Sequence, residues 1–204
     1  MRKRLWCGML AAIVCIGMLW GVVTPATAAE NSTDSYTYDA EGNSQATPAP
    51  YQLKTIILGA DAFGGVALKN PQDFFVDDDH NIYILDGENN RVVMLDPDYH
   101  FVKAITLTLR QEAVDISEAT GIFVNRKHLY IADKKQAAVF VTDHQGNVEL
   151  TIDAPPADKV EQGFVYAPSR VVVGTDDVIY IISANTYNGA LQYDANGTFL
   201  GFFG

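Results

Sequence analysis

Three features of the sequence predict an all-β protein built as a β-propeller of four-stranded blades. A pattern of short apolar runs and turn residues occurs three times, and its tyrosines, Tyr83, Tyr130 and Tyr180, lie 47 and 50 residues apart. Repeats of about 40–50 residues with four strands each are typical of propellers, whose blades pack face to face around a central channel. The runs are rich in Val, Ile, Phe and Tyr, as in strands. No segment has a helical period with caps.

The three copies of the repeat share the same order of apolar strands and polar turns. The copies read PQDFFVDDDHNIYILD from Pro71, ATGIFVNRKHLYIAD from Ala119 and PSRVVVGTDDVIYIIS from Pro168. Three blades make only part of a propeller ring, and we expect them at about residues 68–106, 114–152 and 164–204. The expected strands of the first blade are Asp73–Val76, Asn81–Leu85, Arg91–Leu95 and Phe101–Thr106. We expect one further strand, Leu53–Leu58, and then a flexible connector, Gly59–Gly65.

The N-terminal segment predicts export. Arg2-Lys3-Arg4 precedes the apolar residues 5–23, and Ala26-Thr27-Ala28 follows them. This order matches the basic region, apolar region and cleavage site of a signal peptide. A cleaved signal peptide over residues 1–29 is favoured. An uncleaved anchor, attaching the protein to a membrane through residues 5–23, stays open because 19 apolar residues can just span a bilayer. Both alternatives place the protein outside the cell or at its surface.

The composition of residues 30–204 indicates a tether and a propeller segment, and it excludes some kinds of site and partner. Residues 30–50 are polar and lack aliphatic periodicity, so we expect a disordered tether ahead of a propeller segment over residues 51–204. Both cysteines, Cys7 and Cys15, lie in the N-terminal segment, which leaves no disulfide framework and no thiolate metal site in the exported part. Removing residues 1–29 takes away three of the 14 basic residues and no acidic residue, and leaves a net charge of −14. That charge argues against nucleic acid and anionic membrane surfaces as partners.

The first blade resembles an NHL repeat. The resemblance rests on LKNPQDFFVDDDHNIYILDGENNRVVMLD, residues 68–96, and above all on the Asn-Asn-Arg turn after Asp86. It implies that Asp86 and Asn90 bond the backbone of the turn and that Arg91 stretches over the neighbouring blade. Gly87 is expected to take a positive φ in this turn. The second copy keeps Asp133 but lacks the Asn-Asn-Arg sequence, and the third has a serine at the aspartate position.

Residues for chemistry are sparse. The sequence has no G-x-S-x-G elbow, Gly-rich phosphate loop or Rossmann fingerprint. Enzymatic propellers such as lactonases bind calcium at the channel mouth, where the inner strands begin. The candidates for that position here are Asp73, Glu118 and Arg170, too few carboxylates for a divalent site.

A calcium-loop spacing also occurs after the first strand, but it is incomplete. Asp77, Asp79, Asn81 and Glu88 occupy positions 1, 3, 5 and 12 of the template, whereas Ile82 stands where such a loop needs glycine. We therefore predict no cofactor, with calcium as the alternative. The four histidines fall in turns and lack metal-ligand spacing, so we expect no zinc site.

These observations favour an exported, non-catalytic binding scaffold for a protein, peptide or glycan. The alternative is a propeller-type hydrolase or lyase, similar to lactonases, with an incomplete set of active residues. Three blades cannot close a ring, since propellers usually have four to eight. We therefore expect either missing C-terminal blades, which is favoured, or a homodimer that joins head to tail into six blades.

Overall fold

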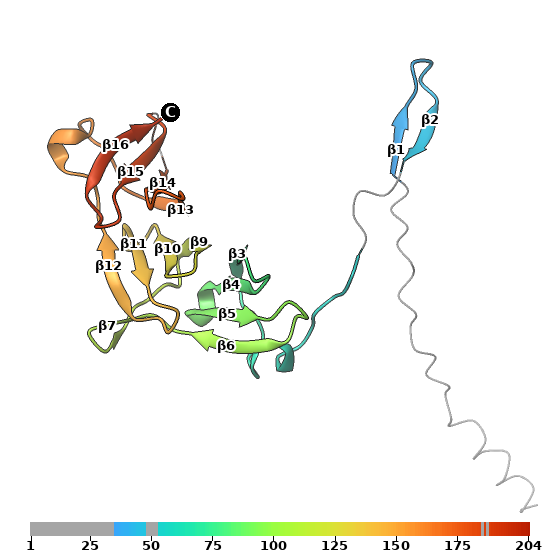
Figure 1. Ribbon diagram of the computed structural model, residues 1–204, viewed down its shortest axis with the longest axis horizontal. Coiled ribbons are helices and arrows are strands. Elements are labelled where there is room, and N and C mark those ends of the chain that lie inside the picture. Colours follow the sequence, from blue (N-terminus) through green and yellow to red (C-terminus); the bar gives the residue numbers. More distant parts are fainter. Residues whose placement is uncertain (1–34, 48–52, 185, 187) are drawn as a thin grey trace, which may run out of the picture. The chain divides into compact units, whose positions relative to one another are not determined.

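The computed structural model describes residues 35–47, 53–184, 186 and 188–204 (Figure 1). The chain divides into two compact units, Met1–Ile56 and Ile57–Gly204. The predicted signal or anchor segment lies outside the described residues. Among the residues that are described, no helix is long and apolar enough to cross a membrane.

The second unit consists of three four-stranded antiparallel sheets (Figure 1). In each sheet the strands are paired in chain order, so the first strand lies at one edge and the fourth at the other. These sheets are the predicted blades, and the fold is a partial β-propeller. The strands are β3 (Pro71–Val76), β4 (Ile82–Asp86), β5 (Arg91–Leu95) and β6 (Phe101–Ile105) in blade one, β9 (Ala119–Val124), β10 (Leu129–Asp133), β11 (Ala138–Thr142) and β12 (Val148–Ile152) in blade two, and β13 (Pro168–Val173), β14 (Ile179–Ser183), β15 (Ala190–Tyr193) and β16 (Phe199–Phe203) in blade three.

The core lies between the blades, because each strand presents apolar side chains on both faces. Tyr83 and Leu85 of blade one pack with Leu129 and Ile131 of blade two. The other face of blade two packs on blade three through a second cluster, which includes Tyr130, Ala132, Ile179 and Ile181. Residues between the blades complete these layers, among them Leu107 and Ile116, which are fully buried. A minor hairpin, β7 (Thr108–Leu109) with β8 (Glu112–Ala113), occupies the first of these connections.

One five-residue turn joins strands at five places in the described chain. Its first aspartate accepts hydrogen bonds at Oδ1 from the N–H groups two and four residues later, at 2.7–3.1 Å. The residue three positions after the aspartate has a positive φ in every case. Such Asx turns favour aspartate first and glycine or asparagine later. The turns begin at Asp39, Asp77, Asp96, Asp143 and Asp194.

The segment before blade one differs from the prediction. Leu53–Leu58 is not a strand, since no neighbouring strand edge pairs with it. The expected flexible connector contains a 3-10 turn, η1 (Asp61–Phe63), and Phe63 is buried. Ile57 and Leu68 pack around Phe63 against Val93 and Leu95 of blade one, and this packing fixes the connector.

The predicted tether also differs. Residues 35–47 form a hairpin of β1 (Ser35–Tyr38) and β2 (Ser44–Thr47), so the prediction of disorder is wrong for them. The Asx turn at Asp39 closes the hairpin, with Gly42 at a φ of 84°. Composition missed it because a single well-chosen turn can specify a hairpin without an apolar face. The rest of the predicted tether lies outside the described residues.

Candidate functional site

The six-residue turn of blade one forms a closed hydrogen-bonded lock. Asp86 is fully buried, and its Oδ2 accepts from Arg91 Nε at 2.7 Å and from Asn89 Nδ2 at 2.8 Å. Asp86 Oδ1 accepts from the backbone N–H of Lys69 at 2.7 Å. Arg91 also donates from Nη1 to the carbonyl of Phe63 at 3.2 Å and from Nη2 to the carbonyl of Val66 at 2.7 Å. Every polar group of this buried pair therefore has a partner, which is what a stabilising role requires.

The neighbouring residues of the turn extend the lock to the next blade. Asn90 lies at a φ of 54°, and its amide group accepts from Ile116 N at 2.6 Å and donates to Val114 O at 3.3 Å. Both partners belong to the connection between blades one and two, not to the turn itself. Gly87 does not take the expected positive φ, because Asn90 supplies the left-handed residue after the 3-10 turn η2 (Gly87–Asn89). A side chain on Gly87 would instead approach Ser117 O to 3.2 Å.

Blade two contains the same aspartate without the arginine. Asp133 is buried, and its Oδ1 accepts from the N–H groups of Lys135 and Gln136 at 2.8 and 2.9 Å. Ala138 occupies the position opposite Asp133 that Arg91 occupies opposite Asp86. Asp133 Oδ2 has no hydrogen-bond partner in the described part of the chain. Burial raises the pKa of Asp133 above its ordinary value, despite the two backbone N–H groups that oppose the shift.

The predicted channel-mouth residues are brought together only in part. Arg170 Nε lies 3.9 Å from Asp73 Oδ2, so side chains from blades three and one meet there. Asp73 Oδ2 also accepts from the N–H of Ile122 at 3.1 Å, and Arg170 donates to the carbonyls of Thr120 and Ser169. Glu118 is exposed, and no hydrogen bond or ion pair of its side chain is found among the described residues. The mouth therefore holds one carboxylate that already binds the inner strands together.

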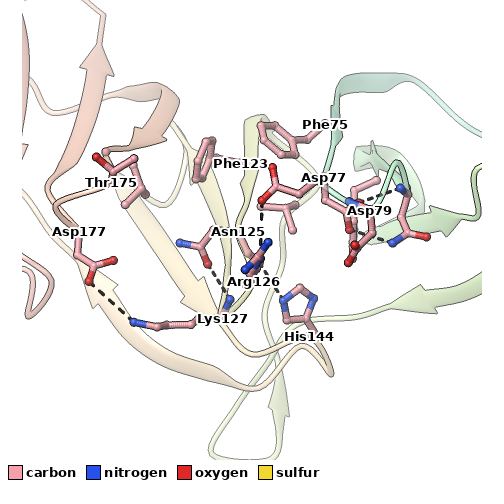
Figure 2. Close-up of a pocket in the computed structure, with 16 residues that line it drawn as sticks. Phe75, Asp77, Asp79, Phe123, Asn125, Arg126, Lys127, His144, Thr175 and Asp177 are labelled. Atoms are coloured by element: carbon pink, nitrogen blue, oxygen red, sulfur yellow. Dashed lines mark hydrogen bonds and ion pairs between the residues drawn. The ribbon is translucent and has the colours of Figure 1, made fainter.

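A cavity lies at the opposite end of the inner strands. It has a volume of about 920 Å³ and is lined by all three blades. Figure 2 shows the rings of Phe75 and Phe123 side by side, with charged side chains below them. The centroids of the two rings are 4.8 Å apart. We call this cavity the turn groove. Most of its polar residues come from the turns between the first and second strands of each blade: Asp77, Asp78, Asp79, Asn81, Asn125, Arg126, Lys127, Thr175 and Asp177.

The charges of the turn groove form loose pairs between blades. Arg126 Nε lies 3.7 Å from Asp78 Oδ2, and Lys127 Nζ lies 3.8 Å from Asp177 Oδ2. All four side chains are more than half exposed, so each pair contributes little to stability and can exchange partners. Two further carboxylates, Asp77 and Asp79, give the groove a negative balance.

The buried wall of the groove is held rigid. Asp77 fixes the turn of blade one by accepting from Asp79 N and Asn81 N, at 2.9 and 2.8 Å. Tyr83 bonds the same carboxylate, and burial together with Asp77 raises the pKa of Tyr83 to about 12. His144 reaches the groove from a different turn, and its Nε2 lies 3.1 Å from Asn125 O. This wall is therefore preformed, whereas the charged rim is exposed.

Sequence reasoning missed the turn groove. From the sequence, no role is assigned to Arg126, Lys127, Phe75 or Phe123, and His144 is placed only in a turn. The available signal was that DDDH, NRKH and GTDD occupy the same position in successive repeats, where a propeller brings equivalent turns to one face. His144 lies in the turn after the third strand of its blade, which emerges at the same end of the blade as the turn after the first strand.

The calcium-loop spacing is not gathered into one site. Asp77, Asp79 and Asn81 form the turn between β3 and β4, whereas Glu88 lies at the far end of β4 and pairs with Lys69 at 3.0 Å. In the described part of the chain, no group of three or more His, Cys, Asp or Glu side chains could hold a metal ion.

Comparisons with known proteins support the fold. No protein-family model and no curated protein matches the chain. Among solved structures, a protein described as the extracellular domain of a hybrid two component system from B. thetaiotaomicron has a TM-score of 0.50 at 12% identity, over 83% of this chain and 25% of that one. Virginiamycin B lyase from Staphylococcus aureus has a TM-score of 0.45 at 13% identity, over 81% and 46%. The chain thus spans less than half of the length of either structure.

Likeness at such low identity shows the fold alone. The propeller fold that the repeats predict is confirmed. No activity is transferred from these structures, and the NHL assignment is not decided by them.

Proposed function

We propose that this chain is an exported, non-catalytic propeller of the NHL type, which binds an extended, positively charged peptide segment in the turn groove. Export is supported by the basic, apolar and small-residue order of residues 2–28. The NHL type is supported by the Asn-Asn-Arg turn of blade one and its lock on Asp86.

The observation that supports the proposal is the set of side chains that line the turn groove. It combines an aromatic wall, a volume suited to several residues of a ligand, and exposed charges that are only loosely paired. Lysine or arginine side chains of a peptide can replace Arg126 and Lys127 as partners of Asp78 and Asp177, while the excess carboxylates favour positive charge. A glycan would use the aromatic wall and the amides of Asn81 and Asn125 instead.

The competing function, a propeller-type hydrolase or lyase, needs several convergent groups with free reactive atoms. Asp73 and Arg170 at the channel mouth are the nearest such pair, and both already bond backbone. Calcium and zinc content of the purified protein, measured by elemental analysis, would distinguish the two functions, because a bound stoichiometric metal favours the enzyme.

The test of binding compares charge partners in the groove. Fluorescein-labelled peptides containing alternating Gly and Lys, and the same peptides with acetylated lysines, are titrated with the protein in a polarisation assay. Asp78→Asn with Asp79→Asn should weaken binding of the lysine peptide roughly twofold to tenfold and leave the acetylated peptide unchanged. Asp98→Asn, an exposed acidic residue in another turn of the same blade, is the matched control.

Equal binding of both peptides by all variants would contradict the proposal. Saturable binding of neutral oligosaccharides, lost in Phe123→Ala, would replace the peptide by a glycan as the ligand of the groove.

A further inference from the structure

Blades one and two each bury one face against the next blade along the chain. On blade one this face includes Tyr83 and Leu85, with 2% and 0% of their surface exposed. On blade two the equivalent residues, Tyr130 and Ala132, are buried in the same way. We call this side of a blade its trailing face. The sequence builds the same interface twice, with a tyrosine and a small or branched apolar residue two positions later.

Blade three has the same trailing face without a cover. Tyr180 and Ile182 stand at the positions of Tyr83 and Leu85, but Ile182 is 49% exposed and Val172 beside it 50% exposed. Phe203 of the outer strand is 62% exposed on the same face. An apolar depression of about 360 Å³ lies among these side chains. Large exposed apolar patches of this kind mark interaction surfaces.

Blade one has the complementary half of this interface uncovered. The opposite side of a blade, its leading face, is buried in blade two through Ile122 and Val124, which are 5% and 3% exposed. The residues of blade one that correspond to them are Phe74 and Val76, and these are 66% and 44% exposed. The connector with Phe63 already packs beside this face, as Ile116 does between blades one and two.

We infer that a second copy of this chain covers both surfaces, so that the trailing face of blade three packs on the leading face of the partner's blade one. The two uncovered faces are the two halves of an interface that the chain itself forms twice. A second copy offers both halves at once, and two identical contacts close a six-bladed ring, which is within the range of known propellers. Closure would also bring a second turn groove to the same end of the channel.

The test uses the full chain, expressed with its own N-terminal segment and purified after secretion. Size-exclusion chromatography with light scattering should give twice the protomer mass that mass spectrometry measures. Ile182→Asp and Phe74→Asp should each halve the mass of the main species, because each places a charge in one half of the contact. Leu109→Asp, which changes an exposed leucine on the β7–β8 hairpin between blades one and two, should remain dimeric.

A mixing experiment tests the head-to-tail arrangement itself. Ile182→Asp keeps an intact leading face and Phe74→Asp keeps an intact trailing face, so an equimolar mixture should form a heterodimer through one good contact. An interface made of identical patches on both copies would give no recovery and would overturn the inference. Circular dichroism melts show whether each variant is folded.

Two other results would also overturn it. The first is a soluble wild-type monomer with one cooperative unfolding transition, since some other segment then covers the faces. The second is a dimer that persists in both the Ile182→Asp and Phe74→Asp variants.

Discussion

Blades one and two use the same buried aspartate in two different ways. Asp86 has both oxygens bonded and faces Arg91, whereas Asp133 faces Ala138 and leaves Oδ2 without a partner among the described residues. The backbones around the two residues are nevertheless alike, and each aspartate ends the second strand of its blade. Asp133 uses its Oδ1 to bond the backbone of its own turn, whereas Asp86 uses its Oδ1 to bond Lys69 N in the connector. Arg91 pairs with the buried charge of Asp86 at Oδ2. Without the arginine the turn persists, but an unpaired carboxylate stays in the core at a cost in stability.

The largest expected effect comes from breaking the complete lock. Arg91→Ala leaves the buried Asp86 with one amide donor on Oδ2 and frees the carbonyls of Phe63 and Val66. Removing one partner of a buried ion pair typically costs about 3–5 kcal/mol, so the melting temperature should fall by on the order of 10 °C. Differential scanning calorimetry measures the change, with Arg110→Ala, at an exposed arginine, as control. A melting temperature within error of the wild type would show that the connector is held by packing alone.

Neutralising Asp86 or Asp133 tests the comparison between the two blades, because the two substitutions should change the unfolding free energy by different amounts. Asp86→Asn replaces charge-assisted hydrogen bonds with neutral ones beside Arg91, which should cost about 1.5–3 kcal/mol. Asp133→Asn keeps the carbonyl oxygen that accepts from Lys135 and Gln136 and removes an unpaired buried charge, so the unfolding free energy should change by less than about 1 kcal/mol. Urea unfolding followed by circular dichroism reports both values. Equal losses in the two variants would mean that Asp133 has a charged partner in solution.

The repeats made most of the fold predictable, because a strand pattern with a fixed period specifies both the strands and their order. The position of the Asp86 turn was predictable for a similar reason, since Asn90 and Arg91 are contiguous with it in sequence. Its bonding partners were not, because they lie in the segments before and after blade one. The turn groove was not, because Arg126, Lys127 and Asp177 meet only when blades stack. The connector was misjudged for another reason: Phe63 looks like an isolated residue in a glycine-rich segment, and only the blade gives it a surface to pack on.

The smallest effect, and the one that separates burial from exposure most directly, is the pH dependence of two aspartates. Burial raises the pKa of Asp133, so the stability linked to its proton is present below the unfolded pKa of about 3.8 and is lost as pH rises through the folded pKa. A hydrogen bond from the backbone N–H of Thr198 lowers the pKa of the partly exposed Asp194, so its contribution is present above about 3.8 and is lost as pH falls. Asp133→Asn should therefore gain most, relative to wild type, near pH 7 and lose this advantage toward pH 4. Asp194→Ala should show the opposite trend, lowering the melting temperature by no more than about 3 °C at pH 7 and by less at pH 3. Melts of both variants between pH 3 and 7 measure the two trends, and parallel curves would mean that the two carboxylates are in similar surroundings.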